Sequence, residues 1–187
     1  PLKSNRLRRL KPLFDSADLS VVNFEGVMSH KRPRIRRRKF DLWVPMGAAS
    51  LFKPVGVDLV SVANNHSFDA GSDGLMETIN ALERYGLEVF GGGGSRQEAL
   101  SPFILHVGQE PEECVSIFSA TVWSNRALTG ASTIALFHTD DKASWDLLVE
   151  EVRDLKGRCP FLTVYIHWGK EGVHRPQTKI IDLAHRL

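Results

Sequence analysis

Three short clusters of carboxylate, amide and imidazole side chains offer chemistry in this 187-residue sequence. Each cluster directly follows an apolar run that is typical of a buried strand. The clusters are Asn23 with Glu25, then Asn64, Asn65, His66 and Asp69, and finally His167 with Glu171 and His174. Such a mixture of oxygen and nitrogen donors suits a borderline divalent metal such as Zn, Mn or Fe. No single pair of these residues has a diagnostic metal-ligand spacing.

Each cluster also has an ordinary structural interpretation. Asn64 and Asn65 are typical turn formers, because asparagine tolerates left-handed backbone. Taken alone, His66 is more often a hydrogen-bonded loop histidine than a ligand or an acid. Glu25 fits an exposed surface position, and the His167 ring fits a hydrogen bond to a neighbouring carbonyl. A functional site is favoured because all three polar clusters coincide with strand ends.

The elements that must position these clusters alternate along the chain, which indicates an α/β layered domain. Apolar runs predict strands at 19–24, 57–63, 87–90, 103–107, 115–120 and 161–166. Helical spacing predicts helices at 72–85 and 145–157, with others starting near 48, 95 and 176. Function in such domains gathers at the carboxyl ends of the strands, so we expect the clusters on one rim.

The composition is that of a globular protein, with 42% hydrophobic and 25% charged residues, and its apolar runs are too short to span a bilayer. Cys114 and Cys159 fit neither a zinc spacing nor a disulfide framework, so we expect buried free thiols. The glycines at 91–94 lack the context of a phosphate-binding loop. We interpret them as a flexible strand-to-helix connection.

The net charge of +2 hides an asymmetry. Residues 1–40 hold 12 Lys and Arg against 3 Asp and Glu, and the remaining residues hold 12 against 19. Most of this excess lies in a loop insertion predicted at 26–45, whose cations include Arg34, Arg36, Arg37, Arg38 and Lys39. The run is either a solvated loop or a clamp for a polyanion. Nucleic acid is the least favoured ligand, because no aromatic residues interleave with the run.

Three motifs resemble one family. The first is Asn23-Phe24-Glu25, and the second is the run 63–71, which reads A-N-N-H-S-F-D-A-G and continues into Gly74, Leu75 and Thr78. The third is H-W-G-K-E at 167–171, followed by Pro176 and Gln177 and then by Leu183 and Ala184. Over residues 15–187 the sequence is similar to the CapA family of poly-γ-glutamate capsule synthesis proteins. This family is a branch of the calcineurin-like metallophosphoesterases.

The resemblance implies a four-layer α/β/β/α sandwich with two divalent metal ions on the strand-end rim. It implies that Glu25 is the bridging carboxylate, Asn65 the amide ligand and His167 a further ligand. His66 takes the place of the imidazole that protonates the leaving group, and Asp69 that of the residue that orients it. The supporting residues are Asn23, Asn64 and Glu171. The implied reaction is hydrolysis of a phosphate ester by metal-activated water.

Two departures from the family pattern concern the ends of the chain. A Gly-Asp motif is missing before Asn23, and a closing Gly-His-x-x-His-like motif is missing after His167. We therefore expect residues 1–187 to be one domain of this kind that lacks both ends. The alternative function is a non-catalytic capsule or envelope factor that binds an anionic polymer. Other capsule-synthesis proteins are the expected partners. The family suggests an extracytoplasmic location, while a cytoplasmic one stays open.

Overall fold

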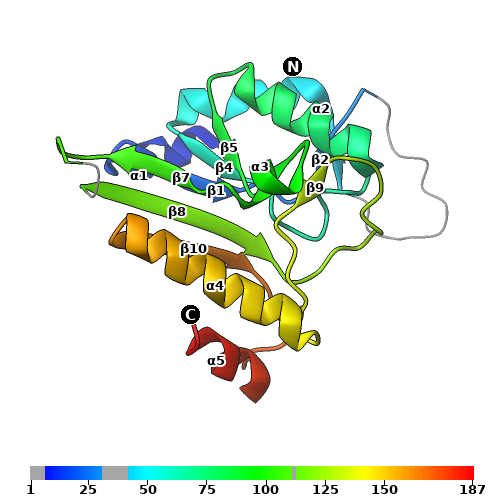
Figure 1. The fold of residues 1–187 in the computed structure, drawn as a ribbon. Helices are drawn as coiled ribbons and strands as arrows, with labels where there is room; N and C mark the ends of the chain where they lie inside the picture. Colours follow the sequence, from blue (N-terminus) through cyan, green and yellow to red (C-terminus); the bar gives the residue numbers. More distant parts are fainter. Residues whose placement is uncertain (1–6, 31–41, 111–112) are drawn as a thin grey trace.

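The computed structural model describes residues 7–30, 42–110 and 113–187, and two three-stranded sheets organise these residues. Figure 1 shows their arrangement. In the first sheet, β1 (Val21–Asn23), β4 (Leu59–Ser61) and β5 (Glu88–Phe90) are parallel, in the order β1-β4-β5. In the second, β10 (Phe161–His167) runs parallel to β8 (Cys114–Thr121), and β7 (Phe103–His106) runs antiparallel to β8.

The two sheets pack face to face. Leu59 and Phe90 from the first sheet form a buried cluster with Ile117 from the second. The hydroxyls of Ser61 on β4 and Ser119 on β8 lie 2.6 Å apart in the same interface. Successive side chains along a strand point to opposite faces of its sheet. The residues that do not lie in this interface therefore form a second apolar surface on the outer face of each sheet.

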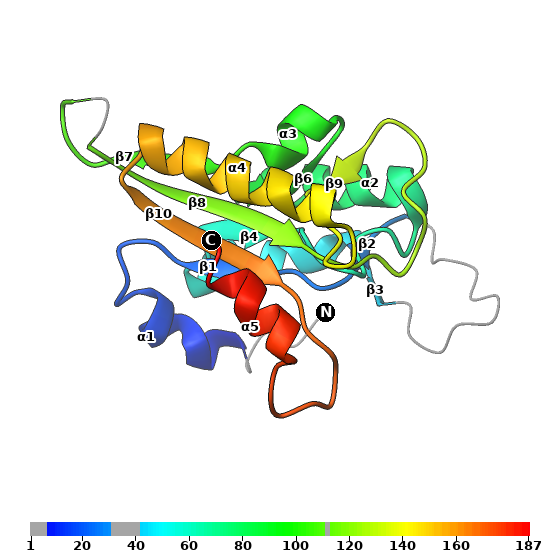
Figure 2. The same ribbon diagram turned by 60° about the horizontal axis from the view of Figure 1, so that its bottom comes forward.

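Helices cover both of these outer surfaces. Helix α2 (Gly71–Glu83) and the 3-10 helices η2 (Met46–Leu51) and η3 (Lys53–Val55) pack on the first sheet. Helices α4 (Lys142–Arg158) and α5 (Thr178–Ala184) cover the second (Figure 2). The predicted four-layer α/β/β/α order is therefore confirmed.

One prediction about the chain's connections needs correction. Gly92–Gly93 is a short strand, β6, which pairs antiparallel with β9 (Thr133–Ile134), so the glycines at 91–94 are more than a flexible connection. Glycine is required there because a Cβ at Gly92 would lie 2.7 Å from a Val62 methyl group.

The ends of the predicted 26–45 loop also pair, as β2 (Val27–Met28) and β3 (Trp43–Val44). The basic run with Arg34, Arg36, Arg37, Arg38 and Lys39 lies outside the described residues. The remaining short elements are η1 (Leu7–Leu10), α1 (Lys11–Phe14) and α3 (Arg96–Leu100). No helix among the described residues is both long and apolar enough to cross a membrane.

The prediction of free thiols is wrong, because Cys114 and Cys159 form a disulfide, with their Cα atoms 5.5 Å apart. Both cysteines are buried. The cause is strand register: Val115 on β8 pairs with Phe161 on β10, which brings the starts of the two strands together. A separation of 45 residues carries no information about this register.

Candidate functional site

Residues from each of the three predicted clusters lie at the carboxyl ends of the strands. Asn23 at the end of β1 pairs in register with Ser61 at the end of β4, so the segments that follow these strands start side by side. His167 is the last residue of β10 and pairs with Thr121, the last residue of β8. Because β1, β4, β8 and β10 contribute these ends to two packed sheets, their exits form one rim.

Asn64 joins the first two exits. Its side chain is fully buried, and its Nδ2 donates to Asn23 Oδ1 at 3.0 Å and to the Phe24 carbonyl at 2.8 Å. Its Oδ1 accepts from the His66 backbone N–H at 3.1 Å and from the Ser67 hydroxyl at 3.0 Å. Both donors and both lone pairs are used. Asn64 is therefore a structural bracket that fixes the turn carrying His66.

His66 and Asp69 form a buried pair. Nδ1 of His66 lies 2.6 Å from Asp69 Oδ2, and the two residues are 8% and 3% exposed. The same carboxylate oxygen accepts the Leu42 backbone N–H at 2.8 Å. An ionised carboxylate only accepts hydrogen bonds, so Nδ1 carries the hydrogen. The other ring nitrogen, Nε2, then points toward the rim, where it lies 3.9 Å from Glu25 Oε1.

His167 meets Asn65 across the rim. Its Nε2 lies 2.7 Å from Asn65 Oδ1, joining residues 102 positions apart in the sequence. Burial lowers the pKa of His167, the carboxylate of Glu25 acts to raise it, and His66 lowers it further, with a net lowering. The ring is therefore held in its neutral form, which is the form that binds a metal.

The donor set at this rim fits a divalent metal. Glu25 offers a carboxylate, Asn65 an amide oxygen and His167 an imidazole nitrogen, and this mixture suits Zn, Mn or Fe. Within ranges 7–30, 42–110 and 113–187, no group of three or more His, Cys, Asp or Glu side chains is arranged to hold a metal ion. The set at the rim therefore depends on the amide oxygen of Asn65 as one of its donors.

The third cluster is only partly brought into the site. Glu171 and His174 are exposed in the segment between β10 and α5. In the part of the chain that the structure describes, Glu171 makes no hydrogen bond with His167. The carbonyl of His167 instead lies 3.2 Å from the Thr121 hydroxyl and accepts the Val122 N–H at 3.3 Å. Contacts from the β8 exit thus hold His167 in place.

The β8 exit supplies a residue that the sequence analysis missed. Asn125 donates its backbone N–H to the Asn65 carbonyl at 3.0 Å, and its side chain lies against His66. The segment 121–139 has weak periodicity, and no strand-end cluster was predicted there. The sequence did contain one indication. If the strand predicted at 115–120 is parallel to that at 161–166, both strands end at the same rim, and the segment after residue 120 then contributes to the site.

A cavity of about 350 Å³ lies beside the His66–Asp69 pair. The start of α2 forms one wall and the segment after Asn125 the other. The lining residues are Phe68, Asp69, Ala70, Gly71, Arg126, Ala127 and Thr129. The β8 exit therefore borders both the proposed metal ligands and an open space next to them.

Two comparisons with known proteins bear on this site. The family model described as "Bacterial capsule synthesis protein PGA_cap" matches residues 3–187. The chain is also similar to the "PGA biosynthesis protein CapA" of Bacillus subtilis (strain 168), with 22% identity over 181 residues. This alignment covers 95% of the chain but 46% of the relative, so the chain spans about half the length of that protein.

Proposed function

The chain belongs to the PGA_cap family of bacterial capsule synthesis proteins, and we propose that it is a metal-dependent phosphoesterase that acts in synthesis of a poly-γ-glutamate capsule. The observation that carries this proposal is the convergence of Glu25, Asn65 and His167 beside the oriented imidazole of His66. They come from three strand exits that are far apart in the sequence. The expected ligand is a phosphate ester, and the expected partners are other capsule-synthesis proteins.

In this proposal, Glu25, Asn65 and His167 hold the metal. When bound, divalent metal ions, of which we expect two, would supply a water of lowered pKa and positive charge that offsets the charge of a phosphoryl oxygen. The low pKa of His167 supports this role, because a neutral ring keeps a nitrogen lone pair for coordination at neutral pH. Asn64 fixes the turn so that Asn65 and His66 both reach the rim.

His66 supplies the proton in this reaction. The Asp69 carboxylate holds Nδ1, which fixes the orientation of the ring. Nε2 faces the rim on the side of Glu25, and from there it donates its proton to the oxygen of the leaving group. The contact between Asp69 and the Leu42 N–H anchors the carboxylate itself.

The test is metal-dependent hydrolysis by the full-length protein. We expect bis(p-nitrophenyl) phosphate or p-nitrophenyl phosphate to be hydrolysed when Mn, Zn or Fe is added to protein freed of metal by a chelator. Glu25→Gln should weaken metal binding in calorimetry and lower this activity. Glu88→Gln is the matched control, because Glu88 is an exposed carboxylate at the opposite end of the same sheet.

Two results would contradict the proposal: no binding of any of the three metals, or equal activity in the wild type and in Glu25→Gln. Binding of poly-γ-glutamate that weakens steeply with salt, without any hydrolysis, would instead support the alternative of a polymer-binding capsule factor. Such binding should survive the loss of Asn65 and His66.

A further inference from the structure

We propose that Trp123 and Asn125 form a substrate-positioning arm beside His66. The indole of Trp123 contacts a flat or CH-rich face of the leaving group, which is the organic part released from the phosphate. Asn125 holds the indole and the His66 imidazole in fixed positions relative to each other. This inference rests on the proposed phosphoesterase function and names the part of the substrate that the site recognises. It is carried by contacts of the β8 exit, which none of the three sequence motifs includes.

The backbone of Trp123 is fixed to the rim. The Thr121 hydroxyl lies 3.1 Å from the Trp123 carbonyl and 3.2 Å from the His167 carbonyl. Thr121 is fully buried at the end of β8. One buried hydroxyl therefore links the segment that carries Trp123 to the strand end that carries His167. Movement of the arm relative to the rim is restricted for this reason.

The indole is exposed and yet oriented. Trp123 is 61% exposed, and its Nε1 donates to Asn125 Oδ1 at 3.1 Å. Exposure of a large aromatic ring to water is unfavourable, and a hydrogen bond from its polar edge leaves the ring faces as the available surface. The exposed ring faces, next to the polar groups of the rim, are therefore the surface that a ligand at the rim can contact.

Asn125 packs on the face of the His66 ring. Its Nδ2 is 3.3 Å from both Nδ1 and Nε2 of His66. An atom in the ring plane at equal distances from both nitrogens would collide with Cε1, which lies between them, so the amide sits over the ring face. The amide therefore does not replace the Asp69 hydrogen bond at Nδ1. It limits tilting of the ring while Nε2 stays directed to the rim.

These contacts place the indole one residue away from the proposed proton donor. Trp123 contacts Asn125, Asn125 covers His66, and the backbone of Asn125 also binds the Asn65 carbonyl. The group nearest to a general acid is the leaving group, since its oxygen receives the proton. The ring face of Trp123 is thus suited to the organic part of that group. Aryl, sugar or nucleobase faces stack on indole, whereas a methyl group offers little area.

The experiment compares two esters with the metal-loaded, full-length protein. We expect Trp123→Ala to raise KM for phenyl phosphate about threefold to tenfold and to leave KM for methyl phosphate within twofold of wild type. Phe161→Ala is the matched control. Phe161 is 69% exposed and lies at the start of β10, at the other end of the same sheet. This control should change neither KM.

Asn125 is tested as a positioning residue by the split between kcat and KM. Asn125→Ala should lower kcat for both esters, because the His66 ring loses its cover, and should raise KM for phenyl phosphate alone. In the Asn125→Ala background, Trp123→Ala should have a smaller effect on KM, since the indole is no longer held. The proposed arm would be contradicted if Trp123→Ala changed KM equally for both esters. It would also be contradicted if the effects of the two substitutions on KM were additive in the double variant.

A binding measurement separates this inference from the proposed function. If the wild type hydrolyses neither ester, the proposed function fails, and the arm is judged by calorimetry with phenyl phosphate and inorganic phosphate. Phenyl phosphate binding that Trp123→Ala weakens and Phe161→Ala does not would support the arm. Absence of phenyl phosphate binding, or binding that does not depend on Trp123, would overturn it.

Discussion

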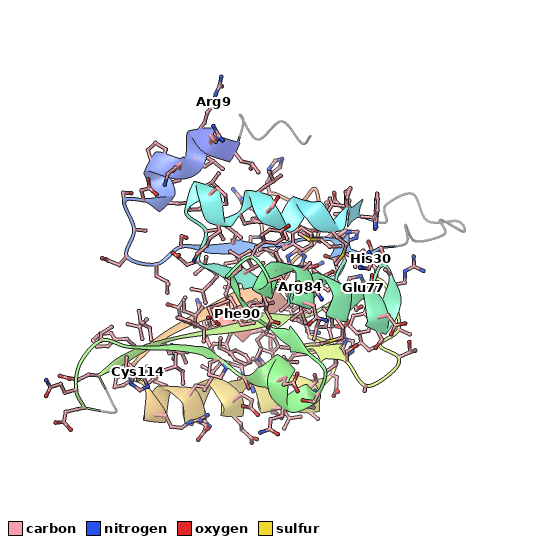
Figure 3. All side chains as sticks on the ribbon, turned by 90° about the horizontal axis from the view of Figure 1, so that it is seen from above. Arg9, His30, Glu77, Arg84, Phe90 and Cys114 are labelled. Carbon is pink, nitrogen blue, oxygen red and sulfur yellow. A yellow bond between two sulfur atoms is a disulfide. The ribbon has the colours of Figure 1, made fainter. Side chains whose placement is uncertain are left out.

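The two ends of the same strands are held together in different ways. At the amino ends, a disulfide joins Cys114 at the start of β8 to Cys159 just before β10. At the carboxyl ends, hydrogen bonds connect His66 with Asp69 and Asn65 with His167. In Figure 3, Cys114 lies at one end of the molecule, while His30 and Glu77, which are joined by a hydrogen bond, lie toward the other.

The first sheet repeats the contrast without a covalent bond. At its amino end, Asp58 Oδ2 accepts the Ser20 N–H at 3.1 Å, and the Asp58 N–H donates to the Ser20 hydroxyl at 3.0 Å. These reciprocal bonds hold the starts of β1 and β4 in register. We infer that the amino ends stabilise the sheets, whereas the carboxyl ends hold the polar groups that we propose to bind a ligand.

The largest expected effect tests the carboxyl end. We predict that His66→Ala lowers the rate of metal-dependent phosphoester hydrolysis about 10²-fold to 10⁴-fold, because the leaving group loses its proton donor. Steady-state kinetics on the folded fraction measure this effect. His106→Ala is the control at the other end, since His106 pairs with Cys114. A loss of similar size in both variants would remove the distinction between the two ends.

The next effect tests the amino end. Replacing both Cys114 and Cys159 by serine should lower the free energy of unfolding by about 2–4 kcal/mol, because the cross-link no longer restricts the unfolded chain. Urea unfolding measures this change, and kcat at 25 °C should stay within twofold. Dithiothreitol should destabilise the wild type but not the serine variant. A large loss of kcat in the folded variant would show that the two ends are coupled.

A third variant, Asn64→Ala, tests a residue at the carboxyl ends of the strands that has a structural role. Asn64→Ala should lower the free energy of unfolding by about 1–3 kcal/mol, because several buried groups lose their partner together. It should also weaken metal binding, since the turn carrying Asn65 is released. Asn23→Ala removes one of these hydrogen bonds and should have a smaller effect on both. Unchanged stability of Asn64→Ala would show that Asn64 is no bracket.

The smallest effect concerns Asp58. Burial acts to raise its pKa, but hydrogen bonds from Ser20 and Lys53 outweigh this and bring the pKa below its ordinary value of 3.8. A carboxylate whose pKa is lower in the folded state than in the unfolded state stabilises the fold at pH values above the unfolded-state pKa. This stabilisation is lost as the pH falls through the folded-state pKa. We therefore expect Asp58→Asn to cost less than about 1 kcal/mol at pH 7. In urea unfolding curves, the difference from wild type should shrink as the pH falls below 3.8 and vanish once Asp58 is protonated in the folded state as well.

Much of the site follows from the sequence because strand ends are visible in local patterns. The apolar run before Asn64 and the run before His167 both predicted strands, and α/β layering predicted that their exits meet. The distance of 2.7 Å between Asn65 and His167 shows how close these exits come. The motif order also predicted the capsule synthesis family, which the match over residues 3–187 confirms.

Other features depend on contacts between distant segments. Turn-forming tendency alone did not distinguish Asn64 from Asn65, and only the family resemblance implied a ligand role for Asn65 and a supporting role for Asn64. In the structure, Asn64 is buried with all its side-chain hydrogen bonds made inside the protein, and Asn65 faces His167. Asn125 was missed because the segment after β8 has no periodicity that marks a strand end. The pairing of Gly92 with Ile134 was missed because two-residue strands leave no pattern at all.

By itself, the sequence determined the residue types, their order and the spacing of apolar positions, and these predicted an α/β layered domain and the donor set. The motifs also carried the resemblance to the family, which implied the four layers. Only the tertiary structure decided that the cysteines are joined, that Asn64 is a bracket, and that Trp123 and Asn125 lie beside His66. The physical reason is that periodicity records which face of one element is buried. Strand register and loop contacts arise only when two elements pack, and their energy depends on both partners at once.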